Sequence, residues 1–482
     1  MKKKFVTNLG LIILLNVLIK PFWMFGIDRS VQNAVGSEDY GLYFALFNFS
    51  LILNILLDLG ITNYNNRNIA MHNQLLSKHL SNVVVLKFLL AVVYAIVCFS
   101  VALIIGYDSR QIFLLSFLVF NQFLLSFILY LRSNLSALYL FKTDSIVSVL
   151  DRFVMIAICS VLLWGNVTSG PMQIEWFVYA QTAAYLVAAT IAFLIVFRRL
   201  EFFRLHFDRS FFIVFLKQSY PYALLILLMA FYNRIDSVML ERMLPDGKTE
   251  AGLYAQSFRI LDAAAMFAFL FAGMLLPIFS KMIKEKDSIK EILHLSFRLI
   301  LAPALVFVAA AIFYSDKIIS MLYTSSSANY SGDIFLFLIP GFIAISISYI
   351  YGTLLTANGN LKHLNMLAFS AMLLNIVLNI FLIPLYKAQG CALSSLITQF
   401  SMAFGQILIA KKYFGLKINY VFISQILIFV TILALTAYLT TQIFTNWLIG
   451  FFVVMISGIA YAFIIKIINI KALYQMVRYG DD

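Results

Sequence analysis

Residues 81–105 read SNVVVLKFLLAVVYAIVCFSVALII, a stretch in which Lys87 is the one charged residue. A membrane-spanning helix needs about 20 mostly apolar residues, so this stretch predicts one span. The same pattern fills the chain of 482 residues, which is 62% hydrophobic and 12% charged, whereas soluble domains carry about 25% charged residues. The sequence therefore predicts an all-α integral membrane protein.

About fourteen such spans are expected, and the segments that connect them are short, at most about 20 residues long. This spacing leaves no room for a soluble catalytic domain. The predicted spans cover residues 5–27, 40–61, 81–105, 112–131, 146–164, 174–197, 214–240, 251–280, 292–314, 333–357, 363–385, 390–410, 418–440 and 445–468.

The short loops indicate how the chain crosses the membrane. With a cytoplasmic N-terminus, the cytoplasmic segments hold 21 Lys and Arg residues and the opposite side holds 6. Basic residues gather on the cytoplasmic side of membrane proteins, so both termini are expected in the cytoplasm. This bias also explains the net charge of +13, and no nucleic-acid partner is expected.

A short repeat relates two parts of the chain. Residues 38–43, EDYGLY, open the second span, and residues 250–254, EAGLY, open the eighth. The span before each motif carries an acid in its outer half, Asp28 and Asp236 respectively. Six spans separate the motifs, an even number, which is typical of parallel repeats in transporters.

The repeat predicts two six-helix lobes around a central cavity, followed by two additional helices. The expected divisions are residues 1–210, 211–417 and 418–482, the last including a cytoplasmic tail.

Charged side chains inside a bilayer are costly and usually face water or a partner. Four of them lie within about two helical turns of a cytoplasmic end, where a long side chain can reach the lipid headgroups. We expect this behaviour of Lys87, Lys217, Arg298 and Lys466.

Three other basic residues lie deeper. Lys20 is about fifteen residues into the first span and precedes Pro21, which should kink or interrupt the helix. Arg234 lies in the outer half of the seventh span, and Arg259 lies roughly 12 Å below the outer surface at ~1.5 Å per residue. If they share one cavity, they could bind an anionic headgroup such as a pyrophosphate.

The acidic residues in the spans allow several interpretations. Arg259 and Asp262 are spaced i, i+3, so they could simply pair and hold helices together. Asp58, with Asp151 and Arg152, could instead form a second polar level of the same path, and Arg152 is a further candidate for pyrophosphate binding. Asp58 or Asp236 could also bind a coupling proton or sodium ion, and the sequence does not choose between them.

The sequence lacks the common enzymatic signatures. The sequence contains no His-Glu-x-x-His motif, no Walker-type phosphate loop and no Cys-x-x-Cys. The three cysteines, Cys98, Cys159 and Cys391, fall within apolar spans and are interpreted as small core residues. We therefore predict no catalytic residue, no metal site and no cofactor.

The tenth to twelfth spans carry the most distinctive residues. They include TANGN at 356–360, NIVLN at 375–379, IPLY at 383–386 and GCA at 390–392. Asn375 and Asn379 lie one turn apart and could hydrogen-bond across helices, Pro384 should end the eleventh span, and Gly390 should allow a tight entry into the twelfth.

With residues 252–255, GLYA, and 58–60, DLG, this pattern resembles the polysaccharide-biosynthesis exporters of the multidrug/oligosaccharidyl-lipid/polysaccharide superfamily. The resemblance covers essentially the whole chain; Cys391 replaces a more usual alanine. It implies a fourteen-helix, two-lobed flippase. Such a protein moves an undecaprenyl-pyrophosphate-linked oligosaccharide from the cytoplasmic to the periplasmic leaflet by alternating access, for O-antigen, capsule or exopolysaccharide. Membrane lipids and the polysaccharide polymerase machinery are the other partners it implies.

Three alternatives remain open. A lipid II flippase has the same helix number and a cationic cavity, and the superfamily motif does not separate it cleanly. A cation-coupled multidrug antiporter typically has twelve helices and an acidic pocket. A membrane polysaccharide polymerase or ligase would carry a long external catalytic loop, whereas the longest outer loop here is residues 315–332.

Overall fold

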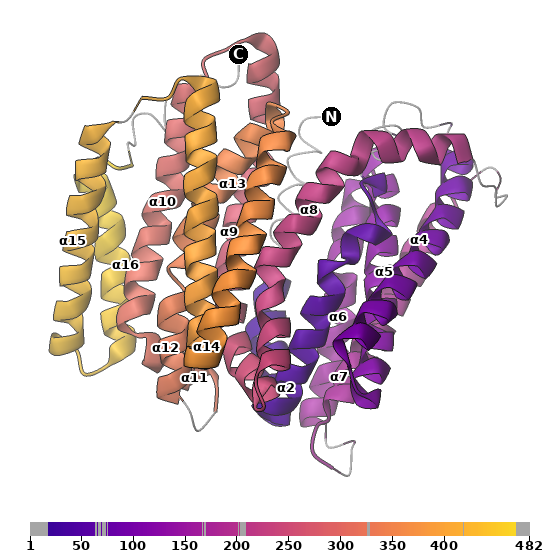
Figure 1. Cartoon of the computed structure of the whole chain (residues 1–482), viewed down its shortest axis with the longest axis horizontal. Helices are drawn as coiled ribbons and strands as arrows, with labels where there is room; N and C mark the ends of the chain where they lie inside the picture. The colour runs from indigo at the N-terminus through magenta and orange to yellow at the C-terminus, as the bar shows by residue number, and fades with distance from the viewer. Residues whose placement is uncertain are drawn as a thin grey trace. The chain divides into compact units, whose positions relative to one another are not determined.

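The computed structural model describes residues 18–468, apart from 63–64, 66–68, 70–73, 75, 166, 168–169, 201, 203–208, 325–327 and 418. These described residues form helices and no strand. They divide into two compact units, residues 1–252 and 253–482. Figure 1 shows the helices of each unit in the colours of the chain.

The described residues of the first unit form six long helices and two short irregular ones. Its elements are the π-helix η1 (Phe22–Asp28), α2 (Arg29–Ile52), the 3-10 helix η2 (Asn54–Leu57), α4 (Leu76–Ile105), α5 (Ser109–Ala137), α6 (Phe141–Trp164), α7 (Ile174–Phe197), α8 (Arg209–Met243) and the first residues of α9 (Gly247–Glu285).

The second unit takes the rest of α9 and all later helices. They are α10 (Lys290–Phe313), α11 (Ser315–Leu322), α12 (Ala328–Leu338), α13 (Gly341–Ala357), α14 (Leu361–Phe414), α15 (Tyr420–Ile443) and α16 (Trp447–Ile464).

The membrane prediction is confirmed by the helices themselves. Among the described residues, eleven helices are long and apolar enough to cross a membrane. Helices satisfy their backbone hydrogen bonds internally, which a lipid environment requires, and large apolar side chains such as Ile104 and Ile456 point outward, 84% and 69% exposed. The number of fourteen passes stays a prediction, because the described residues hold eleven candidate spans, and one of these, α14, consists of two helical arms that meet at Lys387.

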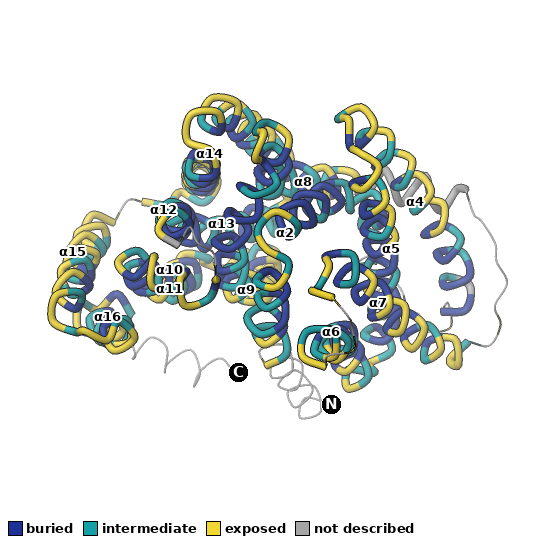
Figure 2. The backbone as a smooth tube through the Cα atoms, turned by 90° about the horizontal axis from the view of Figure 1, so that it is seen from below, coloured by how far each residue is buried: buried dark blue, intermediate teal, exposed yellow. Residues whose placement is uncertain are grey.

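Burial separates central helices from peripheral ones. In the first unit, 61% of the most apolar window of α5 is buried, and α5 packs against α2, α4, α6 and α7. In the second unit, α15 is only 17% buried by the same measure, and Figure 2 shows it largely exposed. The pair α15 and α16 packs against α10, as expected of helices added at the edge of a lobe.

Pro21 is followed by irregular helix, as predicted. The chain adopts a π-helix directly after it, from Phe22 to Asp28. Proline lacks a backbone donor, so it cannot complete a regular α-helical hydrogen-bond pattern. The turn into the second span then occurs at Gly36, where φ is +81°, a value that favours glycine.

Several predicted spans are interrupted where the sequence indicated continuous helix. The second span leaves α-geometry after Ile52 instead of continuing to residue 61, and the tenth divides into α12 and α13 around Pro340. Pro384 does not end the eleventh span, because α14 continues past it to a reversal at Lys387, with φ +51° and ψ −131°.

Gly390 makes the predicted tight entry into the twelfth span. A Cβ atom added there would overlap the carbonyl oxygen of Leu382 on the preceding segment. Asn375 and Asn379 are both fully buried, and Asn375 Nδ2 donates to Ser394 Oγ at 3.5 Å. These contacts confirm hydrogen bonding between the two arms of α14.

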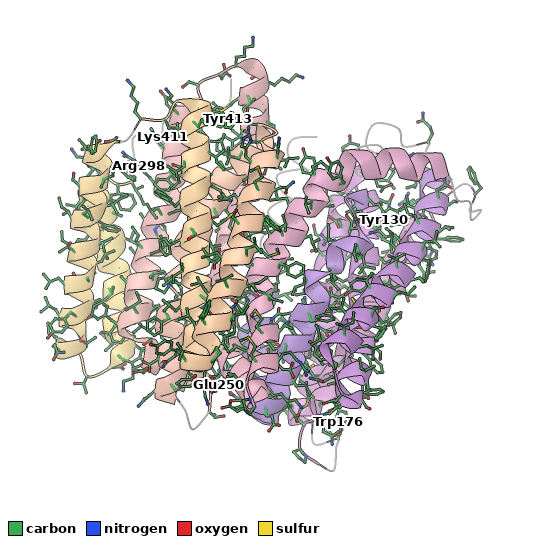
Figure 3. The ribbon with its side chains drawn as sticks, in the orientation of Figure 1. Tyr130, Trp176, Glu250, Arg298, Lys411 and Tyr413 are labelled. Atoms are coloured by element: carbon green, nitrogen blue, oxygen red, sulfur yellow. The ribbon has the colours of Figure 1, made fainter. Side chains whose placement is uncertain are left out.

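The two compact units do not coincide with the predicted lobes. Contacts place α8 with the N-terminal helices, where it packs against α2, although the repeat assigns residues 211–417 to the second lobe. The lobe boundaries, which concern the repeat, stay a prediction. Figure 3 shows Arg298, Lys411 and Tyr413 at one end of the second unit.

Candidate functional site

Two of the predicted basic residues, Lys20 and Arg152, come together in the first unit. Lys20 directly precedes Pro21 and is half-buried, and Arg152 lies on α6. Their charges are close enough to repel each other, and the charge of Arg132 also acts on Lys20. Arg132 has its own partner, because its Nε lies 2.7 Å from Asp144 Oδ1.

Aromatic rings surround the guanidinium group of Arg152. Its Cζ atom lies 5.5 Å from the ring centroid of Trp23 and 5.9 Å from that of Tyr185. Both distances are within the range of cation–π attraction. Trp23 also stacks on Phe177 with centroids 5.9 Å apart, and Tyr43 meets Phe177 edge-on at 5.2 Å. We call Lys20, Arg152, Trp23 and Tyr185 the aromatic–cationic site.

The aromatic–cationic site has more positive than negative charge. Asp151 Oδ2 lies 3.6 Å from Arg152 Nε, so one carboxylate stands beside two cations. The side chain of Arg152 remains 24% exposed. A guanidinium can donate two parallel hydrogen bonds to a phosphate, so this arrangement can bind an anion.

Arg234 lies where α8 contacts α2. Its Nη1 donates to Asn48 Oδ1 at 3.5 Å, and Asn48 Nδ2 donates to Ser237 Oγ at 2.9 Å. The neighbouring Asp236 is 1% exposed. Arg234 therefore belongs to a polar contact between two long helices, and Asp236 is buried near it in the sequence. Their predicted roles in substrate and ion binding stay predictions.

Arg259 and Asp262 lie on the part of α9 that belongs to the second unit. Both side chains are half-buried. Their pairing and their contribution to the same cavity stay predictions.

Asp58 lies at the break in the second span, and Lys87 approaches it from α4. Lys87 Nζ lies 2.6 Å from Asp58 Oδ1, and Lys87 is 1% exposed. The prediction that Lys87 extends to the headgroups is therefore wrong. The carboxylate and freed backbone oxygens at the break draw the ammonium inward, and sequence spacing alone could not indicate them.

Arg298, Lys466 and Lys217 were also expected to reach the lipid headgroups. Arg298 lies 4.6 Å from the ring centroid of Phe422, and its Nη1 donates to the carbonyl oxygen of Lys466 at 3.5 Å. Lys466 itself has a φ of +61° at the end of α16. The side chain of Lys217 lies outside the described residues.

A polar cluster that the sequence did not indicate joins α8 to the predicted outer ends of α4 and α5. Gln111 Nε2 donates to Glu241 Oε1 at 2.7 Å. Arg242 Nη2 donates to the carbonyl oxygens of Ile105 and Gly106 at 2.8 and 3.3 Å. We call these five residues the outer contact cluster. Asp108 and Gln111 form a capping box at the start of α5, and this D-x-x-Q pattern is the local sequence signal that could have indicated the region.

The repeated motif makes a close contact with its own copy. A Cβ atom added at Gly41 would overlap the carbonyl oxygen of Lys248 and the nitrogen of Gly252. A Cβ atom added at Gly252 would overlap the carbonyl oxygen of Ser37. Lys248 and Ser37 each precede their glycine by four residues, so the contact is symmetric, as expected of a structural repeat.

Metal and thiol chemistry find no support among the described residues. No group of three or more His, Cys, Asp or Glu side chains could hold a metal ion there. Cys98, Cys159 and Cys391 are free and buried, consistent with small core residues.

Two family models match the sequence. The polysaccharide biosynthesis protein model matches residues 6–283, and the MatE model matches residues 221–381. None of the curated proteins searched matches the chain.

Solved structures share the fold at low sequence identity. A lipid II flippase MurJ in an inward closed conformation has a TM-score of 0.72 at 16% identity, over 97% of this chain and 99% of that one. An inward-facing multidrug resistance MATE family transporter has a TM-score of 0.62 at 14% identity, over 85% and 98%. A superfamily transporter from Pyrococcus furiosus, described as having a binding pocket of reverse polarity, has a TM-score of 0.59 at 13% identity, over 86% and 96%.

The described helices have the fold of transporters of the multidrug/oligosaccharidyl-lipid/polysaccharide superfamily, and residues 221–381 match the MatE model. Because the first family model covers more than half of the sequence, the chain belongs to the polysaccharide biosynthesis protein family.

Proposed function

We propose that this protein is a flippase for undecaprenyl-pyrophosphate-linked polysaccharide repeat units, which it moves from the cytoplasmic to the periplasmic leaflet by alternating access. The aromatic–cationic site carries the proposal, because Lys20 and Arg152 place two cations beside one carboxylate. A pyrophosphate needs cations of this kind. The rings of Trp23 and Tyr185, which are themselves buried, hold the guanidinium group of Arg152 in place.

The outer contact cluster supports the direction of transport. Its hydrogen bonds join α8 to α4 and α5, and the Gly41–Gly252 contact adds a close backbone approach at the start of α2 and α9. With the predicted orientation, these contacts close the periplasmic end of the first unit. In this state the headgroup would enter from the cytoplasmic side, and the contacts would separate when the protein opens outward.

The proposed location follows from the same topology. The protein would span the bacterial inner membrane with both termini in the cytoplasm. It would release the lipid-linked unit on the periplasmic leaflet, where a polymerase could extend the polysaccharide. The products to examine are O-antigen, capsule and exopolysaccharide.

A lipid II flippase is the second candidate. Lipid II also presents a pyrophosphate, and the fold matches a lipid II flippase with a TM-score of 0.72. A pocket for cationic drugs is less compatible with the aromatic–cationic site, because Lys20 and Arg152 would repel such compounds.

Cells that lack the gene provide the test. Lipid-linked repeat units should accumulate unpolymerised on the cytoplasmic leaflet, and the intact protein should restore surface polysaccharide. A double variant, K20Q/R152Q, should fail to restore it, whereas the exposed control pair K411Q/K412Q should succeed. Normal surface polysaccharide in the deletion strain would contradict the proposal. Loss of cell-wall synthesis with normal polysaccharide would favour lipid II.

A further inference from the structure

The ammonium group of Lys87 lies inside the first unit among three oxygen acceptors. Its Nζ donates to Leu57 O at 3.0 Å, to Asp58 Oδ1 at 2.6 Å and to Ser126 Oγ at 2.9 Å. An ammonium has three protons, so every donor has an acceptor. The ring centroid of Tyr130 lies 5.9 Å from Nζ and adds a cation–π contact.

The break in the second span supplies two of these acceptors. The chain leaves α-geometry after Ile52, forms η2 and then takes left-handed backbone at Leu59 and Gly60, with φ of +46° and +91°. Carbonyl groups near a helix end lack their usual backbone donor. Leu57 O therefore needs another partner, and Lys87 provides it from α4.

The oxygens around Lys87 resemble those of a cation site in a transporter. They are one carboxylate, one backbone carbonyl and one hydroxyl, from a broken helix and from α5. Interrupted membrane helices use such carbonyl oxygens to coordinate sodium ions or protons. Here the ammonium occupies the central position, so a positive charge is built into the chain.

Asp58 provides a route between this position and water. Its side chain is 25% exposed, whereas that of Lys87 is 1% exposed. Thr62 Oγ1 also donates to Asp58 Oδ1, at 2.5 Å. Among the described residues, Asp58 and Tyr130 are the titratable groups that contact the ammonium. A proton can therefore pass between Lys87 and the partly exposed carboxyl group of Asp58.

We propose that Lys87 and Asp58 form the proton-binding site that drives transport, with the ammonium in the place that a coupling sodium ion would occupy. This inference rests on the proposed transport function. One proton moves from Lys87 to Asp58, which leaves a neutral amine and a carboxylic acid, and the acid then releases that proton to water. The neutral amine holds Leu57 O and Asp58 more weakly, so the broken segment is free to change its geometry.

Arginine at position 87 tests the proposal. An arginine stays protonated at any accessible pH, so K87R keeps the positive charge and removes the proton exchange. In proteoliposomes under an imposed pH gradient, we expect K87R to lose gradient-driven transport of the lipid-linked oligosaccharide by at least tenfold, along with proton movement measured by an internal pH-sensitive dye. Full gradient-driven transport by K87R would overturn the proposal and make Lys87 a fixed tie between helices.

Two further variants keep the test decisive. D58N keeps a hydrogen-bonding side chain but cannot accept the proton. We expect it to lose proton coupling, and this test remains available if K87R does not fold. Retained proton coupling in D58N would overturn the proposal. Tyr94 is the matched control, because its hydroxyl donates to Ser50 O at 2.7 Å and also ties α4 to the second span. Y94F should keep coupling. Wild-type protein that moves protons but not the lipid-linked substrate would contradict the proposed function alone.

Discussion

Gly41 and Gly252, the glycines of the two copies of the repeated motif, lie in direct backbone contact. Each glycine faces the carbonyl oxygen of the residue four positions before the other. The motif thus marks a close backbone approach of α2 and the start of α9, and neither position has room for a side chain.

Alanine at either glycine should separate these two segments. The added methyl group meets backbone atoms, which cannot rotate away, so we expect G41A and G252A each to destabilise the folded protein by roughly 1–3 kcal/mol. Thermal unfolding in detergent measures this loss. Gly273 is the control on α9, because nothing lies within 4 Å of its added Cβ; G273A should unfold at or above the wild-type temperature. Unchanged stability of both G41A and G252A would show that the contact relaxes freely.

A disulfide across the α2–α8 contact should stop transport. Asn48 and Ser237 are joined by a short hydrogen bond of 2.9 Å, so cysteines at these positions are expected to be within bonding reach. In a background with Cys98, Cys159 and Cys391 replaced by alanine, oxidation of N48C/S237C should abolish transport, and a reductant should restore it. Oxidised protein that transports at the wild-type rate would mean that α2 and α8 stay together throughout the cycle.

Replacing one member of the Lys87–Asp58 pair should lower the free energy of unfolding more than replacing both. K87M leaves a carboxylate without its ammonium, and loss of one partner from a fully buried pair typically costs about 3–5 kcal/mol. Because Asp58 is 25% exposed, we expect roughly 2 kcal/mol instead. The double variant K87M/D58N should recover part of this loss. Wild type, the two single variants K87M and D58N, and the double variant form a double-mutant cycle. If the changes in unfolding free energy of the single variants add up to that of the double variant, direct coupling between the two side chains is contradicted.

Asp316 should produce a local pH dependence of stability. Burial, followed by the charge of Asp333, raises the pKa of Asp316 above its usual 3.8. Ionisation of this carboxyl group therefore opposes folding. The cost is absent below pH 3.8 and complete above the raised pKa.

The variant D316N lacks this ionisation, so its unfolding temperature should rise relative to wild type as the pH increases through the raised pKa. Paired thermal scans across that pH range measure the difference. D287N, in an exposed loop, is the control and should track wild type. A constant difference between D316N and wild type at every pH would remove the electrostatic explanation.

The sequence predicted the apolar helices well because span length is set by the membrane. The sixth span, residues 174–197, matches α7 at both ends. Irregular backbone was harder to predict. The reversal at Lys387 lies three residues beyond the proline that seemed to mark it, because Pro384 can still complete the last turn of a helix.

The candidate site was predicted only in part, for a similar reason. Lys20 and Arg152 were selected because charges deep in a membrane are rare, and the structure places them together. Lys87 was misjudged, because its distance from the helix end suggested contact with headgroups, whereas the broken second span offers it acceptors inside the protein. Long-range contacts such as Gln111 with Glu241 have no local sequence pattern.

The most direct test of the central claim is the rate at which purified protein moves a fluorescent undecaprenyl-pyrophosphate-linked oligosaccharide across proteoliposome membranes. A quencher that cannot cross the membrane reports how much of the fluorescent lipid lies in the outer leaflet. Wild type and K411Q/K412Q should equilibrate the two leaflets, and K20Q/R152Q should do so at least tenfold more slowly, which corresponds to about 1.4 kcal/mol of lost interaction. Equal rates for all three folded proteins would contradict the assignment of the headgroup to Lys20 and Arg152.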